Sequence, residues 1–514
     1  MLEILIIFWI VVFFKKVLFW LWLWQTKQYF LKRFIDEFRS KKGKKLLFNP
    51  INISKLLLLI GLIFTEWSIF PLLAIYLLEI FSFIRHILRK TIKYPVINRN
   101  TIVLIIGGIC LEVVLLLSLF VISVSFLVLF DIFSILLVSL LIIPFRIVKE
   151  YLENKTIKAA IKKRSELDIK TIGITGSYGK TSTKEIVSTI LGYKYKVFKT
   201  QDHENTDPVV AKYILDELDD SYEIFVAEIG AYFRGGIKSA CRFVQPNIGI
   251  LTGINQQHVS LFGSQEAIIE TKYELIECLP DDGVAIFNGE NENTLELYKK
   301  ETKKKKLYGF SNNIDGVDTD LWADNIKINK EMISFDINSK TETVNLTVKA
   351  LGTHTLLNIL ASVCAAMEYG IALQDLTKIN ISKALGGKNL KIGVNNIKFI
   401  DSSYSTNPDG VMYSLSYLKH WPGKKIIIMP SLIELGKETN KILYNIGEKI
   451  NEVCDFGIIT NKEAFDEISK ATKKVKYLED SDSIIKELGE LGEDDIVLIE
   501  GRINEKLKAK LLCQ

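Results

Sequence analysis

Apolar side chains are concentrated in the first 145 residues of the chain. Residues 2–24 are apolar or aromatic apart from three charged positions, and two longer apolar blocks follow at 56–84 and 102–145. A helix that crosses a bilayer needs roughly 20 apolar residues. The pattern therefore predicts five membrane segments, within a range of four to six: one in the first block, a tight hairpin or re-entrant pair in the second, and a full hairpin in the third. For the first block, an amphipathic helix lying on the membrane surface is the alternative.

Among the acidic residues of these blocks, Glu66, Glu112 and Asp131 are expected at membrane depth. Ionisable groups are costly in that position and are often functional. They also mark helix ends and turns, and both interpretations stay open. No small-residue cleavage site follows the first apolar stretch, and further apolar segments come after it, so a signal peptide is not expected.

Basic residues flank the apolar blocks. There are eight in residues 25–54, five in 85–100 and seven in 146–164. The positive-inside rule places all three segments on the cytoplasmic face, which predicts a multi-pass protein of the cell membrane. Through Ser165 the chain has 23 Lys and Arg against 9 Asp and Glu, whereas the whole chain carries only +5. The rest is therefore acidic, a division that favours anionic lipid headgroups as partners and argues against a nucleic-acid binder.

Beyond the apolar part, the alternation of buried-strand and helix patterns is typical of α/β domains. Strands are expected near residues 397–401, 425–429, 456–460 and 495–499 of a Rossmann-like, doubly wound C-terminal domain. Alternating polar and apolar residues from Lys304 to Val348 predict an antiparallel excursion in the domain before it. The expected organisation is a helical transmembrane module (1–145), a basic cytoplasmic linker (146–165), an ATP-binding central domain (166–384) and a C-terminal α/β domain (385–514).

A glycine loop lies between the first strand and the first helix of the central domain. Residues 170–174 read as a buried strand, 184–191 have a helical pattern, and the loop between them contains a Gly-Lys-Thr sequence. Backbone N–H groups in such a loop, with the helix N-terminus, form a cradle for phosphate. Ile174 stands where the usual motif has its first glycine, so the spacing is not the standard one. The candidate ATP-binding residues of this loop are Gly176, Ser177, Gly179, Lys180, Thr181 and Ser182.

A phosphate loop alone does not separate kinases, transport ATPases, GTPases and ligases, so the later motifs decide. They occur in the order Val226–Ala231, Asn247–Thr252, His258 with Leu261–Ser264, Glu270–Glu274, Leu279–Gly283, Asn288–Asn291, Gly352–His354 with Asn358, Asp401–Pro408 and Glu434–Gly436. Together with the phosphate loop, this ordered series resembles the Mur ligase family, and most closely its branch that adds D-alanyl-D-alanine. The resemblance covers about residues 170–510. It implies an ATP-dependent ligase that forms a peptide bond through an acyl phosphate in cell-wall precursor synthesis.

The resemblance also implies roles for individual residues. Thr181 and Glu228 would hold the Mg²⁺ on the outer phosphates of ATP. His258 resembles the ligand of a second Mg²⁺, and Lys272 resembles a carbamylated lysine that contributes a further anionic ligand. The less specific alternatives are a structural histidine and a lysine on a helix surface. The residues that resemble nucleotide contacts are Asn288, His354, Asn358, Lys388 and Asp401.

Several positions depart from the family pattern. Thr355 replaces an Asn, Ser402 replaces an Asp, Lys388 stands for an arginine, and Glu500 takes the place of a basic residue. These changes leave the phosphate chemistry intact but put the amine substrate in doubt. At the front of the chain, a membrane module takes the place of the family's nucleotide-sugar domain, which would suit a substrate presented at the membrane.

The expected partners are membrane lipid, a small peptide or amino acid as the amine, and a carboxylate acceptor that is lipid-linked or UDP-linked. A membrane synthase of the poly-γ-glutamate type and a P-loop ATPase coupled to the membrane part remain alternatives. The six cysteines form no C-x-x-C pair, so reduced cytosolic thiols are expected and no zinc site or disulfide framework is visible.

Overall fold

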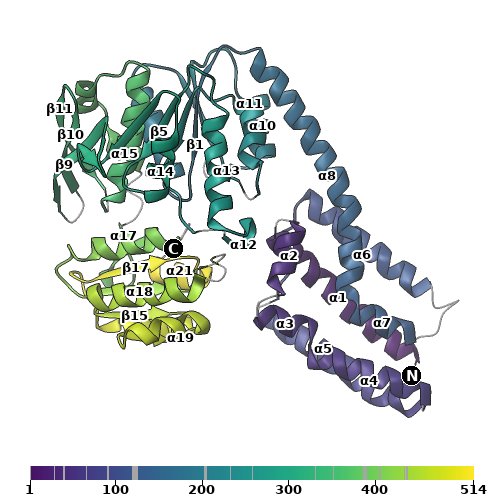
Figure 1. Cartoon of the computed structure of the whole chain (residues 1–514). Coiled ribbons are helices and arrows are strands. Elements are labelled where there is room, and N and C mark those ends of the chain that lie inside the picture. Colours follow the sequence, from purple (N-terminus) through teal and green to yellow (C-terminus); the bar gives the residue numbers. More distant parts are fainter. Residues whose placement is uncertain are drawn as a thin grey trace. The chain divides into compact units, whose positions relative to one another are not determined.

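The computed structural model of the chain forms two compact units, Met1–Lys155 and Thr156–Gln514 (Figure 1). The structure describes residues 2–27, 29–38, 41–64, 66–89, 92–117, 125–201, 205–231, 233–256, 259–329, 332–350, 352–385, 390–403, 407–432, 435 and 438–513. The predicted linker 146–165 is not a separate segment, because it forms the second half of a single helix, α8 (Ser134–Ser165).

The N-terminal unit is helical throughout its regular elements. Its helices are α1 (Leu2–Thr26), α2 (Leu31–Glu37), α3 (Lys41–Leu47), α4 (Pro50–Phe64), η1 (Glu66–Ser68), α5 (Ile69–Leu88), α6 (Arg99–Leu117), α7 (Ser125–Ile132) and α8. α1 packs against α5, α6 and α7, and α4 packs against α5 and α7. Apolar side chains of these helices form one cluster that includes Trp9, Phe13, Leu72 and Val138.

Among the described residues, three helices are long and apolar enough to cross a membrane: Glu3–Thr26, Ile69–Leu88 and Arg99–Leu117. The pair α7 and α8, bent by 69°, makes a fourth if it is counted as one span. The predicted number of five is therefore not reached. The second block splits as expected, but α4 has 15 residues, about 22 Å of helix, which is short of a bilayer's roughly 30 Å hydrocarbon core.

The hairpin predicted for the second block is present. Lys55 of α4 forms an ion pair with Glu79 of α5, and these residues lie at similar distances on either side of η1. Such a contact requires the two helices to run antiparallel.

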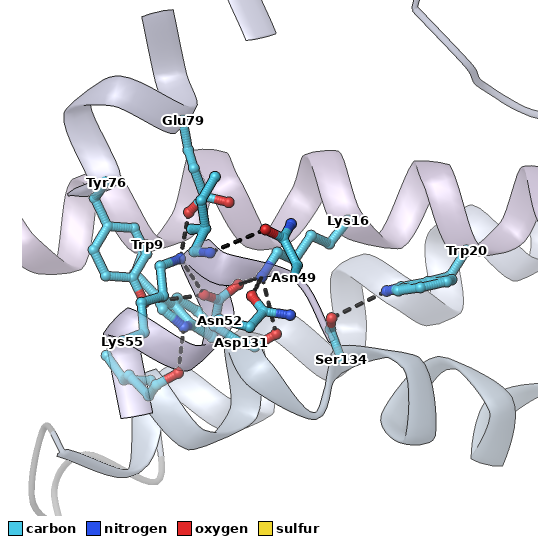
Figure 2. A network of polar contacts seen from close by, with 12 residues as sticks. Trp9, Lys16, Trp20, Asn49, Asn52, Lys55, Tyr76, Glu79, Asp131 and Ser134 are labelled. Atoms are coloured by element: carbon cyan, nitrogen blue, oxygen red, sulfur yellow. Dashed lines mark hydrogen bonds and ion pairs between the residues drawn. The ribbon is translucent and has the colours of Figure 1, made fainter. Parts of the chain in front are cut away.

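A cluster of buried charges joins four helices of this unit (Figure 2). Asp131, at the end of α7, is fully buried and lies 2.9 Å from Lys16 of α1 and 2.5 Å from Lys55. Tyr76 donates a hydrogen bond to the same carboxylate at 3.2 Å, and Lys55 also bonds Glu79. Two lysines thus form direct ion pairs with two acids, and Lys15 interacts electrostatically with the same groups. Because each charged group already has a partner, we interpret it as the polar core that holds α1, α4, α5 and α7 in register.

The other acidic residues of the apolar blocks differ. Glu112 is buried in α6, and its Oε1 has no hydrogen-bond partner among the described residues. The side chain of Glu66 lies outside the described part of the structure.

Asp131→Asn should destabilise the N-terminal unit by about 3–5 kcal/mol, since it leaves two lysines buried without their counter-charge. Thermal unfolding in detergent, followed by circular dichroism, measures the effect. The matched control is Glu150→Gln, which removes an exposed partner of Arg146 and should change stability by less than about 1 kcal/mol. Adding Lys16→Met to Asp131→Asn should restore part of the loss, because the remaining Lys55–Glu79 pair is balanced. Equal melting temperatures for the Asp131→Asn and Glu150→Gln variants would contradict this role of the cluster.

The second unit begins with a nine-stranded sheet in the order β11-β10-β9-β6-β5-β4-β1-β3-β2. Its strands are β1 (Lys170–Thr175), β2 (Val197–Lys199), β3 (Ile224–Glu228), β4 (Ile248–Leu251), β5 (Val284–Asn288), β6 (Lys305–Gly309), β9 (Leu321–Ile328), β10 (Met332–Ser339) and β11 (Thr343–Lys349). β1–β6 pair in parallel, and β6 also pairs in parallel with β9. β9, β10 and β11 pair antiparallel with one another, so the antiparallel excursion predicted for residues 304–348 is confirmed for all of it except β6. A small hairpin, β7 (Asn313–Ile314) and β8 (Val317–Asp318), lies between β6 and β9.

Helices cover both faces of this sheet (Figure 1). α9 (Lys180–Leu191), α15 (His354–Glu368) and α16 (Ile381–Leu385) pack on one face. α10 (Asp207–Asp216), α11 (Gly236–Val244), α13 (Gln265–Glu277) and α14 (Glu292–Lys300) pack on the other. The remaining elements of this domain are α12 (Val259–Phe262) and η3 (Leu373–Lys378). The end of α8 also joins the second face, where buried Arg164 donates hydrogen bonds to the carbonyl oxygens of Leu167 and Ile169.

The C-terminal domain holds a six-stranded sheet in the order β12-β13-β17-β14-β15-β16. Its strands are β12 (Leu390–Ile392), β13 (Lys398–Ser402), β14 (Lys425–Met429), β15 (Phe456–Ile459), β16 (Val475–Tyr477) and β17 (Ile496–Glu500). α17 (Pro408–Leu418), α18 (Thr439–Val453) and α19 (Lys462–Ala471) cover one face, and α20 (Ser481–Glu487) and α21 (Glu505–Leu512) cover the other. All four predicted strands are present, and all strands except β12 pair in parallel.

Candidate active site

The predicted phosphate loop lies between β1 and α9, as its strand–loop–helix pattern requires. Gly179 caps α9 with φ +76°, a conformation that favours glycine. A Cβ at Gly179 would lie 2.5 Å from the side-chain oxygen of Asn358, and one at Gly176 would lie 2.1 Å from the hydroxyl of Thr252. Both positions therefore need glycine for close approach as well as for the turn. The result is a compact loop whose N–H groups lead into the positive end of a helix.

Lys180, the first residue of α9, folds back over this loop. Its Nζ donates to the carbonyl oxygen of Gly176 at 2.9 Å. Burial lowers the pKa of Lys180, and the nearby Glu228 carboxylate opposes this shift. Ser177 and Ser182 complete the loop and the first helical turn, with Ser177 Oγ accepting from the N–H of Asn255 at 3.1 Å. A lysine held this way can pair with the outer phosphates of a nucleotide.

The predicted metal-binding pair is brought together. Thr181 Oγ1 donates to Glu228 Oε2 at 2.8 Å, although the two residues are 47 positions apart in the sequence. The other carboxylate oxygen, Oε1, accepts from Asn205 Nδ2 at 2.7 Å. Glu228 is 2% exposed and lies at the carboxyl end of β3, beside the phosphate loop. A hydroxyl and a carboxylate are hard oxygen ligands, so this donor set suits Mg²⁺ on the phosphates of ATP.

Lys272, on α13, is 6% exposed, so the alternative of a lysine on a helix surface is wrong. Burial and the nearby charge of Lys180 lower its pKa to about 7, against the opposing effect of Glu228. The lowered pKa increases the share of neutral amine near neutral pH. A neutral amine is what reaction with CO₂ requires.

Two predicted nucleotide contacts have partners within the protein. Asn288, fully buried at the end of β5, donates to the carbonyl of Thr252 at 2.8 Å and accepts from the N–H of Glu290 at 3.0 Å. Asn358, on α15, accepts from Thr183 Oγ1 at 3.3 Å. Both side chains hold the phosphate loop and its flanking strand ends, and their contact with nucleotide stays a prediction.

The C-terminal domain reaches this site through α17. Asn255 Nδ2 donates to Asp409 Oδ2 at 2.9 Å, and the ring of His354 lies 5.7 Å from that of Tyr413. Burial lowers the pKa of His354 to about 4, so its imidazole is neutral, and its Nδ1 has no hydrogen-bond partner in the described part of the chain. An orphaned ring nitrogen one helical turn before Asn358 is consistent with the predicted contact to a bound molecule.

Two acidic residues lie at the carboxyl ends of β13 and β17. Asp401 accepts from Ser403 at 2.6 Å and pairs with Lys391 at 3.0 Å and Lys508 at 3.2 Å. Burial disfavours its charge, but these bonds outweigh burial and lower the pKa to about 2. Burial raises the pKa of Glu500 to about 8, against hydrogen bonds from two serines. At neutral pH the site therefore has one ionised and one mainly protonated carboxyl, where the family pattern has a base in place of Glu500.

His258 and Lys388 lie outside the described residues, as do Tyr404 and Glu434. Their roles stay predictions. Two further residues of the site, Asn205 and Lys184, lie against Glu228 and were not predicted from the sequence. Its spacing could have indicated Lys184, because it follows Lys180 by one helical turn and shares the same face of α9.

The fold and the site define a phosphate-loop, nucleotide-binding α/β protein in which a hydroxyl–carboxylate metal site, a buried lysine and a doubly wound C-terminal domain act together. The comparisons agree with this class. Residues 174–366 match the family model described as Mur ligase middle domain, and residues 390–503 match Mur ligase, glutamate ligase domain. The chain belongs to the Mur ligase family of ATP-dependent ligases, which form peptide bonds.

Similar curated proteins carry the name UDP-N-acetylmuramoyl-tripeptide–D-alanyl-D-alanine ligase. The one from Buchnera aphidicola is 30% identical over 349 residues, which are 65% of this chain and 73% of that protein. The one from Bacillus subtilis is 28% identical over 57% of this chain and 64% of its own length. The chain thus spans under two thirds of the Bacillus relative.

Solved structures with the same fold include MurF from Acinetobacter baumannii, with a TM-score of 0.63 at 24% identity over 70% of this chain and 81% of that one. MurF from Thermotoga maritima in complex with ADP has a TM-score of 0.60 at 24% identity, over 70% of this chain and 82% of that one.

Proposed function

We propose that the chain is a membrane-anchored ligase that joins D-alanyl-D-alanine, or a closely similar amine, to the terminal carboxylate of a cell-wall peptide precursor. The observation that carries the proposal is the convergence of Lys180, Thr181, Glu228 and Lys272 at the phosphate loop. The names of the curated relatives support the amine and the UDP-linked tripeptide as substrates. The three apolar helices and the flanking basic loops support the anchor.

When bound, ATP and Mg²⁺ would supply an activated phosphoryl group, which converts the carboxylate to an acyl phosphate that the amine can attack. The residues of this chain provide position and charge. Lys180 and the loop N–H groups offset negative charge on the phosphates, and Thr181 and Glu228 would hold one metal ion. The contact between Asn255 and Asp409 closes the C-terminal domain over the loop, so that the amine can be held on that side.

We further propose that Lys272 reacts with CO₂ to form a carbamate that helps to hold a second Mg²⁺, with His258 as another ligand. The support is the burial of Lys272 and its pKa of about 7, caused by burial and by Lys180. An ammonium group there would repel the metal ion, whereas a carbamate is an anionic oxygen ligand.

The catalytic unit is proposed to lie on the cytoplasmic side, because all three basic loops would then face the cytoplasm. A green fluorescent protein fused after Gln514 should fluoresce, and alkaline phosphatase fused there should be inactive. The same pair of reporters fused to an N-terminal signal sequence is the control for reporter function. Active phosphatase at Gln514 would overturn the orientation.

The substrate assignment is tested by release of inorganic phosphate from ATP by the full chain in detergent, with a panel of amino acids and dipeptides. Each amine is paired with a UDP-linked or a lipid-linked tripeptide acceptor. D-alanyl-D-alanine should give the fastest release. Because Glu500 changes the family's charge in the C-terminal domain, a different preferred amine would correct the substrate without removing the ligase assignment.

A further inference from the structure

Glu228 lies among three lysines. Lys180 and Lys272 both interact electrostatically with its carboxylate. The third, Lys184 of α9, is completely buried, and its Nζ lies 4.0 Å from Glu228 Oε2. Lys180 is proposed to bind the phosphates and Lys272 to form the carbamate, so both already have functions that involve bound groups. Lys184 is left as a basic side chain beside the metal-binding carboxylate. Burial lowers its pKa, and the carboxylates of Glu228 and Glu185 oppose this shift and favour the charged form.

Other charged side chains near Lys184 fix the position of its ammonium group. Its Nζ lies 3.5 Å from Glu185 Oε1, and Glu185 in turn pairs with Lys199 on β2. Its position on α9, one turn after Lys180, directs it toward the end of β3 rather than toward solvent. A buried lysine is expensive to desolvate and persists only when it has partners of opposite charge.

We infer that Lys184 is a positioning residue that serves as the built-in counter-cation of Glu228 and makes metal binding depend on nucleotide. Without nucleotide, the Lys184 ammonium offsets the charge of Glu228 and repels a divalent cation. The phosphates of ATP bring enough negative charge to overcome this repulsion, so Mg²⁺ enters with the nucleotide and not before it. A metal ion bound alone would occupy the loop before the phosphates arrive, and Lys184 prevents this.

The physical basis is the size of the Coulomb interaction. Two unit charges about 4 Å apart interact strongly where water is partly excluded, because the effective dielectric constant there is lower than in bulk water. Removal of Lys184 should therefore strengthen metal binding without nucleotide, whereas simple damage to the site would weaken it. The direction of the change separates the two cases.

The experiment measures Mn²⁺ binding to the full chain in detergent by electron paramagnetic resonance, with and without ADP. Lys184→Met should bind Mn²⁺ at least about tenfold more tightly than the wild type when ADP is absent. Lys184→Gln carries the same prediction and keeps a polar hydrogen-bond donor at this buried position, which guards against misfolding of the methionine variant. Lys184→Arg keeps the charge and should behave like the wild type.

Lys199→Met is the matched control. It removes one positive charge from the same chain of ion pairs, but at a side chain that is 41% exposed, so Mn²⁺ binding should change less than about twofold. A folded Lys184→Gln that binds Mn²⁺ no more tightly than the wild type would overturn the inference.

The inference rests on the proposed phosphate site, and the two can fail separately. If the wild type does not bind Mn²⁺ even with ADP, the proposed site itself fails. If the wild type binds Mn²⁺ with ADP but the Lys184 variants show no gain without it, only the role of Lys184 fails.

Discussion

Lys180→Ala will reduce ATP-dependent ligation at least about a thousandfold, which corresponds to about 4 kcal/mol of lost transition-state stabilisation. The lysine folds over the phosphate loop and is the only basic residue in the sequence from Thr175 to Thr183. Alanine also leaves the loop backbone unchanged, because Lys180 follows the conformationally special Gly179 and has no special backbone angle itself. The rate of phosphate release under saturating substrates measures the loss.

The matched control is Lys170→Ala, which removes an exposed lysine ten residues earlier, at the start of β1. It should keep near-normal turnover. Thermal unfolding should show that both variants are folded. A Lys180→Ala rate within about tenfold of the wild type, or about 1.4 kcal/mol, would rule out the phosphate-loop assignment.

Lys272→Arg will lose activity nearly as completely as Lys272→Ala. Guanidinium stays charged at all accessible pH values and cannot form a carbamate, so arginine places a cation where the second metal ion would bind. Alanine only removes the ligand. For that reason a small carboxylate such as acetate, added at high concentration, should partly restore Lys272→Ala but not Lys272→Arg.

The titration of Lys272 also predicts how the activity depends on pH. With a pKa of about 7, Lys272 becomes a neutral amine as the pH rises through 7. At fixed dissolved CO₂ the carbamate, and with it the activity, should therefore increase from pH 6 to pH 8. Lys238→Arg, an exchange at an exposed lysine of α11, controls for the change of side chain. Near-normal turnover of Lys272→Arg would return Lys272 to a structural role.

Patterns that depend on local sequence predicted the structure well. The phosphate loop, the antiparallel excursion and the four strands of the C-terminal domain follow from periodicity and glycine placement, and all are present. The pairing of Thr181 with Glu228 was implied by the family resemblance, and the structure brings the two residues together because β1 and β3 are neighbours in the sheet. The short edge strands β12 and β16 were not predicted, since three residues carry too little periodic signal.

Features that depend on tertiary contacts could not be predicted from the sequence. Lys184 reads as an ordinary helix lysine until β3 is placed against α9. Asp131 was recognised only as an acidic residue at membrane depth, since its partners Lys16 and Lys55 lie 115 and 76 residues away. The expected five membrane segments exceed the three or four helices of spanning length because α4 has only 15 residues, a length that the composition of the second block does not reveal.

The most direct measurement is peptide-bond formation by the purified full chain in detergent, supplied with ATP, Mg²⁺, a UDP-linked tripeptide and D-alanyl-D-alanine. The expected result is a UDP-linked pentapeptide, detected by mass spectrometry, with one ADP and one phosphate released per bond formed. A lipid-linked acceptor in place of the UDP-linked one tests the preference of the anchored enzyme under the same conditions. If ATP is hydrolysed but neither acceptor, with any amine of the panel, gives a new amide bond, the chain is not a ligase and the proposed function is wrong.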